Sequence, residues 1–119
     1  MNVVVLQGQL SSSPIVKVLE SGSVLMNLEL TTRVGGVACS VPLVWFDPSE
    51  SLLLASGDHV SLVGTVRRRF YRAGGSTQSR TEVVVELLSL TKNKRALGAQ
   101  RRWIAAAMGP DVFGGLRSA

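Results

Sequence analysis

A short run that combines four arginines with two aromatic rings is the part of this sequence best suited to a chemical task. The run reads Arg67, Arg68, Arg69, Phe70, Tyr71 and Arg72. In an extended strand, alternation places Arg67, Arg69 and Tyr71 on one face and Arg68 and Phe70 on the other. Guanidinium groups pair with phosphates and rings stack on bases, so this arrangement is typical of a platform for single-stranded nucleic acid.

The same segment also has an alternative interpretation that is purely structural. The run could belong to a solvated hairpin in which Phe70, on the face of Val66, closes the end of a barrel. For Phe70 the two interpretations are balanced, whereas for Arg69 and Tyr71 we expect ligand contact.

A second aromatic candidate lies at the end of a strand predicted over residues 37–46. Trp45 continues the apolar face of Val41 and Leu43, so we expect Trp45 in the core and Phe46 facing outward. Pro42 inside this strand predicts an edge position or a bulge. The full predicted interface comprises Arg33, Phe46, Arg67, Arg69, Phe70, Tyr71, Arg72 and Arg80.

The charge distribution supports a polyanionic partner. Residues 1–64 hold two basic and five acidic residues, whereas residues 65–119 hold eleven basic and three acidic ones. Ten of the thirteen basic residues are arginine. Lysine would be sufficient for solubility, whereas the planar guanidinium group of arginine can form two parallel hydrogen bonds to a phosphate. A solubilising surface and a basic segment that lies on an anionic membrane are the alternatives.

The sequence contains few residues that could catalyse a reaction or bind a metal ion. Cys39 and His59 are the only cysteine and the only histidine, so neither a multi-cysteine zinc site nor an internal disulfide is available. We expect a buried, inert Cys39 thiol, a surface His59, no enzymatic activity and no cofactor. With no apolar run near the roughly twenty residues of a membrane span, we expect a cytoplasmic, nucleoid-associated protein without a membrane partner.

The chain reads as a single small β domain with a basic extension. Alternating apolar residues and turn signals predict strands over 1–10, 24–31, 37–46, 60–72 and 80–90, with a short extended run over 15–19. A short helix is expected between the third and fourth strands, beginning at Asp47 or Ser49 and ending at Gly57, with its leucines plugging the barrel. This pattern favours an all-β, five-stranded Greek-key barrel of the OB type over an open sandwich, which needs about seven strands.

The predicted domain boundary follows residue 91. Residues 1–91 form the OB domain, and residues 92–119 form a basic tail that is helical over 96–108 if it folds, stops at Gly109-Pro110 and is loose thereafter.

Residues 1–90 resemble the bacterial single-stranded DNA-binding protein family. The resemblance is carried by Asn2–Leu10, Asn27–Thr32, Val44-Trp45-Phe46, Gly57–Arg69 and Arg80–Val85. It implies an OB barrel, a homotetramer, and coating of exposed single strands in replication, recombination, repair or DNA uptake. It also implies stacking roles for Phe46 and Tyr71 and backbone contacts for Arg67, Arg69 and Arg72.

The sequence departs from the family pattern in three places. Ser40 stands where an aromatic residue is common, the turn at Gly35-Gly36 is short, and the acidic tail tip that recruits repair enzymes is missing. These departures predict a secondary or paralogous member that binds single strands less tightly or recruits fewer partners than a housekeeping member. Recombination or replication proteins are among the partners that the resemblance implies. The departures also leave open an OB-type protein-interaction module of the primosome or recombination machinery that binds nucleic acid weakly.

Overall fold

The structure is a computed structural model that describes residues 1–48 and 53–109. Its elements are β1 (Val4–Leu10), β2 (Ile15–Val18), β3 (Val24–Val34), β4 (Val37–Phe46), β5 (His59–Ala73), β6 (Ser76–Leu90) and α1 (Lys94–Met108). The predicted strands are all present, and β5 and β6 are longer than expected because they continue to the turn between them.

Five of the six strands close into a barrel. The sheet order is β1-β5-β6-β4-β3-β2, and β1 also pairs with β3 at Gln9↔Thr31 and Leu10↔Leu30, which completes the ring. All pairings are antiparallel except β4 with β6, which are parallel at Leu43↔Val83 and Val44↔Val84. β2 lies outside the ring, on the edge of β3. This is the predicted all-β, five-stranded Greek-key barrel of the OB type.

The barrel is filled by alternate aliphatic side chains and one indole. Leu10, Leu30, Leu43, Leu62 and Val60 are almost fully buried. Trp45 joins this cluster with 4% of its surface exposed, whereas its neighbour Phe46 is 37% exposed. The assignment of Trp45 to the core and Phe46 to the outside is therefore confirmed.

Two glycines allow strands to cross at close range. A Cβ atom at Gly8 would overlap the backbone carbonyl oxygen of Thr31, and one at Gly64 would overlap that of Val84. Gly64 also lies at the register shift of the β5–β6 pairing. Close approach of two backbones is thus the reason that both positions are occupied by glycine.

The position of the helix differs from the prediction. Residues 53–55 are not helical, and residues 49–52 lie outside the described part of the chain, so no helix is described between β4 and β5. The Asp58 side chain accepts a hydrogen bond from the Ala55 backbone amide at 2.9 Å, and a side chain-to-backbone bond of this kind offers the backbone an alternative to the helix. Leu54 still packs against the core, whereas Leu53 is 98% exposed.

The helix that is described follows the barrel. Asn93 caps α1 by accepting a hydrogen bond from the Ala96 amide at 3.1 Å, and Gly109 ends it with a positive φ. The predicted helix over 96–108 is confirmed, with two further residues at its start. Pro110 and residues 111–119, of which the latter are expected to be loose, lie outside the described residues.

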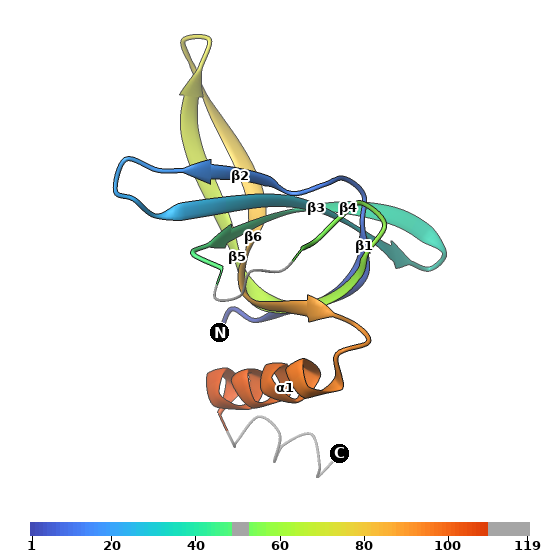
Figure 1. Ribbon diagram of the computed structural model, residues 1–119. Coiled ribbons are helices and arrows are strands. Elements are labelled where there is room, and N and C mark those ends of the chain that lie inside the picture. The colour runs from blue at the N-terminus through green and yellow to red at the C-terminus, as the bar shows by residue number, and fades with distance from the viewer. Residues whose placement is uncertain (49–52, 110–119) are drawn as a thin grey trace.

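A buried amide joins α1 to the barrel. The Gln100 side chain donates to the Ser61 carbonyl at 2.9 Å and to the Ser89 hydroxyl at 3.0 Å, and accepts from the Ser61 hydroxyl at 2.9 Å. Figure 1 shows α1 at one end of the barrel and the β5–β6 hairpin projecting from the other end. The two basic segments of the sequence therefore lie at opposite ends of the molecule.

Two smaller predictions have different outcomes. The β4–β6 pairing covers only Leu43 and Val44, so Pro42 lies on a stretch of edge strand, as predicted. Cys39 is exposed rather than buried, because it lies on the β3–β4 hairpin beyond the barrel core.

Candidate nucleic-acid interface

The projecting hairpin of β5 and β6 carries most of the predicted interface. Its strands pair continuously from Arg67↔Glu82 to Ala73↔Ser76, around a turn at Gly74-Gly75 where both glycines have positive φ. Asn2 clamps its base: the side chain accepts from the Val66 amide at 2.8 Å and donates to the Val66 carbonyl at 2.6 Å. The hairpin is thus a defined extension of the barrel.

One face of the hairpin gathers rings and guanidinium groups. Cross-strand pairing places Arg69 opposite Arg80, on the same face as Arg67 and Tyr71. The Arg67 guanidinium carbon lies 5.2 Å from the centre of the Phe46 ring, which joins the end of β4 to this face. We call these five residues, Phe46, Arg67, Arg69, Tyr71 and Arg80, the arginine–aromatic surface.

A buried carboxylate lies beneath this surface. Glu82, 2% exposed, contacts Arg69 Nε at 2.8 Å and Arg67 Nη2 at 3.6 Å, in both cases through Oε1. The hydrogen bond and the charge of Glu82 raise the pKa of the Arg69 guanidinium above its ordinary value. Arg69 therefore stays charged at every pH used to handle proteins.

The Arg67 side chain is held less firmly than that of Arg69. Its Nε and the Oε2 of Glu82 are buried without a hydrogen-bond partner among the described residues. The ion pair between Arg67 and Glu82 is therefore incomplete, because a donor of one and an acceptor of the other are unused. Less interaction energy is lost when Arg67 turns to a ligand than when Arg69 does so.

Each ring of the hairpin region has an arginine over it. Besides the Arg67–Phe46 pair, Arg69 lies 5.3 Å from the centre of Tyr71 and Arg68 lies 5.1 Å from that of Phe70. Such cation–π contacts hold both partners in place. Tyr71 is 40% exposed, and the Arg67 and Arg69 side chains are 39% and 44% exposed, so the surface is ordered and open to solvent.

Phe70 lies on the opposite face of the hairpin from Tyr71. Phe70 is 63% exposed and Val66, on the same face, is 45% exposed, so the alternative in which Phe70 closes the end of the barrel is wrong. The hairpin leaves the barrel before these positions, and none of the described segments covers their face. Arg68 shares this face and donates to the Ser79 hydroxyl at 3.0 Å.

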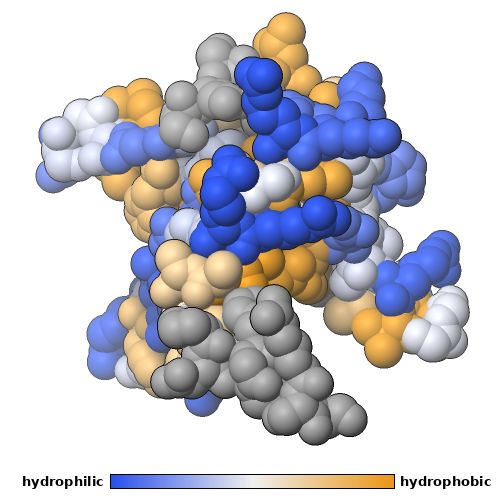
Figure 2. Space-filling view, turned by 90° about the horizontal axis from the view of Figure 1, so that it is seen from below, coloured by the Kyte–Doolittle hydropathy of each residue, from blue (hydrophilic) through white to orange (hydrophobic). Residues whose placement is uncertain are grey.

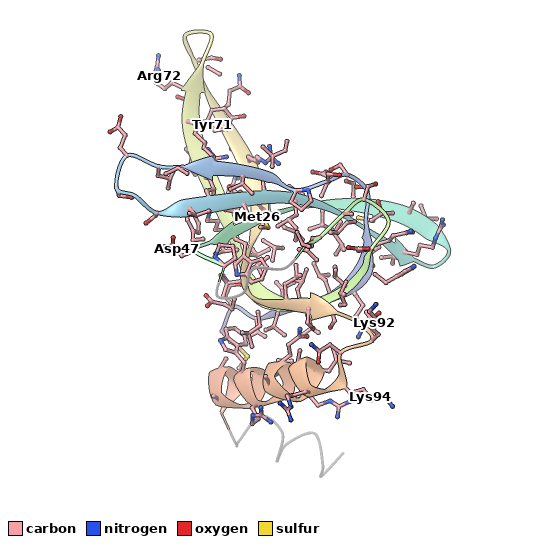
Figure 3. All side chains as sticks on the ribbon, in the orientation of Figure 1. Met26, Asp47, Tyr71, Arg72, Lys92 and Lys94 are labelled. Atoms are coloured by element: carbon pink, nitrogen blue, oxygen red, sulfur yellow. The ribbon has the colours of Figure 1, made fainter. Side chains whose placement is uncertain are left out.

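The remaining predicted arginines, Arg33 and Arg72, lie near the ends of strands, next to the two hairpin turns. Arg72 donates to the Gly75 carbonyl at 3.0 Å at the tip of the β5–β6 hairpin, where Figure 3 shows it beyond Tyr71. Arg33 donates to the Gly36 carbonyl at 3.3 Å in the separate β3–β4 hairpin. The fold therefore does not bring Arg33 to the arginine–aromatic surface. Ser40 likewise lies on that second hairpin, where its hydroxyl donates to Glu29 at 2.7 Å.

Glu82 was missing from the predicted site. The signal for it was present, because counting outward from the turn at Gly74-Gly75 pairs Arg67 with Glu82. Its near-complete burial could not be read from the sequence, since that depends on the surrounding side chains.

Other kinds of site find little support in the described part of the chain. No group of three or more His, Cys, Asp or Glu side chains there is placed to hold a metal ion. None of the described helices is long and apolar enough to span a membrane. Comparison with known sequences adds no assignment, because no protein-family model and no curated protein matches this chain.

Proposed function

We propose that this protein binds single-stranded DNA without sequence preference and without altering it chemically, and protects exposed strands during replication, recombination, repair or DNA uptake. The observation that carries the proposal is the arginine–aromatic surface. It presents two exposed rings, Phe46 and Tyr71, interleaved with the guanidinium groups of Arg67, Arg69 and Arg80. The resemblance of residues 1–90 to bacterial single-stranded DNA-binding proteins supports the same function, in the cytoplasm at the nucleoid.

The binding mode follows from the contacts within this surface. Bases stack on the rings, since every base offers a flat π-face, and phosphates pair with the guanidinium groups. Arg67 and Arg69 already lie over the rings, so a base replaces or sandwiches a guanidinium that then turns to the neighbouring phosphate. Glu82 offsets one of the positive charges, which keeps the free hairpin from repelling itself.

Salt dependence tests this mode directly. The affinity for an oligothymidine should fall with salt, with a log–log slope of about −0.7 for each phosphate contact on a single strand. Three arginines, Arg67, Arg69 and Arg80, therefore predict a slope of about −2 per barrel, measured by fluorescence titration across a salt series. A flat response would contradict the proposal, since stacking alone leaves no counterions to release.

Assembly into a homotetramer, which the family resemblance implies, is part of the proposal. Exposed aliphatic side chains support it: Ile15, Val16 and Val18 on β2 are 69%, 58% and 69% exposed, and Val5 on β1 is 53% exposed. Apolar edge strands of this kind are commonly covered by another chain.

Light scattering with and without a long oligothymidine measures assembly and binding together. We expect four chains per particle and an added mass with the oligonucleotide. The alternative function, an OB-type protein-interaction module, is favoured by the same exposed β2 strand. It predicts an assembly whose mass does not change when the oligonucleotide is added.

A further inference from the structure

A cavity lies beside the contact between α1 and the end of the barrel. It measures about 320 Å³ and lies between the first half of α1 and residues 87–89 of β6. Its apolar wall comprises Trp45, Leu87, Leu88, Ala96 and Ala99. This volume falls at the lower end of the range for small-ligand sites, which starts at about 300 Å³.

Two guanidinium groups border this cavity. Arg95 and Arg102, which lie two turns apart on α1, line it, and both are exposed. Residues seven apart lie on one helix face, with Ala99 between them, so the two charges flank an apolar strip. Figure 2, which views this end of the molecule, shows hydrophilic side chains lying across an apolar surface.

Neither guanidinium has an acidic partner within the described residues, where the only ion pairs are those of Glu82. Residues 91–109 contain no aspartate or glutamate at all. Lys94 and Arg95 occupy the first turn of α1, and its last turn has no basic residue. Positive charge in the first turn opposes the helix dipole, so the dipole does not account for Arg95, and Arg102 lies in the middle of α1, where the dipole has little effect.

The polar part of the wall is already engaged. The Gln100 amide is hydrogen-bonded to Ser61 and Ser89, and the Asn93 side chain caps the helix. A ligand therefore meets an apolar wall and two positive charges, and few free groups that could read a hydrogen-bond pattern. The ligand that fits this chemistry has a flat, apolar ring and negatively charged groups, and it is bound without recognition of its sequence.

We propose that the cavity is a second contact site for the same single strand, with a base against the apolar wall and phosphates at Arg95 and Arg102. The inference rests on the proposed function and extends its footprint. Phe46 of the arginine–aromatic surface and Trp45 of the cavity wall are neighbours in β4 but lie on opposite sides of it, so a strand that reaches both sites must pass around the barrel. A nucleotide supplies both the flat ring and the charge that the cavity lacks.

The test compares two double variants of the full chain. Arg95→Ala/Arg102→Ala removes the cavity pair, and Lys94→Ala/Arg101→Ala removes two charges at the same spacing from a part of α1 that does not line the cavity. Each is titrated with oligothymidines of about 4 and about 16 nucleotides, the limits of OB-fold site sizes. Thermal unfolding of both variants controls for damage to α1.

The cavity pair should matter for the long strand only. We expect Arg95→Ala/Arg102→Ala to bind the longer oligothymidine about tenfold more weakly and to reduce the magnitude of its salt slope by about 1.4, the share of two phosphate contacts. Binding of the shorter one should stay as in the wild type. The Lys94→Ala/Arg101→Ala variant should retain the wild-type slope with both lengths.

A cavity-filling variant gives a second measurement that keeps both charges. Ala99→Leu should weaken binding of the longer oligothymidine and leave its salt slope unchanged, because only the base contact is lost. Normal binding by both this variant and Arg95→Ala/Arg102→Ala would overturn the inference and leave the proposed function intact.

Two further results are informative. A wild-type protein that binds neither length would overturn the proposed function itself. A glutamate-rich peptide with a C-terminal leucine serves as a probe for a protein partner. If Arg95→Ala/Arg102→Ala binds both oligothymidines normally but no longer binds this peptide, the cavity belongs to a protein partner, and the inference is overturned.

Discussion

Replacing Tyr71 or Phe46 with alanine is expected to weaken oligothymidine binding by about 5- to 150-fold, which corresponds to about 1–3 kcal/mol for each stacked base. Both rings are partly exposed, at 40% and 37%, on the arginine–aromatic surface. Loss of either ring also releases the arginine above it, Arg69 or Arg67, so the contact to phosphate becomes less defined. Fluorescence titration at fixed salt measures the change.

Matched controls separate stacking from general damage to the hairpin. Phe70→Ala removes an exposed ring from the opposite face of the same hairpin and should leave the affinity within about threefold of the wild type, well inside one stacking contribution. Tyr71→Phe keeps the ring and should bind nearly normally. Unchanged affinity in both Tyr71→Ala and Phe46→Ala would remove the stacking role from this surface.

Replacing Trp45 with alanine should lower the free energy of unfolding by about 3–5 kcal/mol, the usual cost of deleting a large buried aromatic side chain. Trp45 is 4% exposed and belongs to the cluster that fills the barrel. It lies where β4 and β6 separate beyond their short parallel pairing, so few neighbours can move in to fill the space left behind. Urea denaturation followed by circular dichroism measures the loss.

The adjacent ring is the natural control for this experiment. Phe46→Ala removes a side chain that is 37% exposed and should cost clearly less stability than Trp45→Ala. Trp45→Phe, which keeps an aromatic ring in the core, should recover much of the loss. Equal destabilisation by Trp45→Ala and Phe46→Ala would contradict the assignment of the two rings to opposite sides of β4.

The amino-acid sequence by itself determined the strands and the sides on which their residues lie. Alternation is a local property of an extended chain, so it was enough to put Trp45 inside and Phe46 outside, and to align Arg67, Arg69 and Tyr71. The glycine pairs of the two hairpin turns were equally legible, because positive φ angles favour glycine. These features predicted the barrel and its projecting hairpin.

Only the tertiary structure decided what covers each side chain. It buried Glu82 beneath two arginines, left Phe70, Val66 and Cys39 exposed, and placed Arg33 on a different hairpin. It also placed the predicted helix, α1, against β5 and β6, where it borders a cavity. The physical reason is that burial depends on segments distant in sequence, whereas side-chain alternation depends only on neighbouring residues.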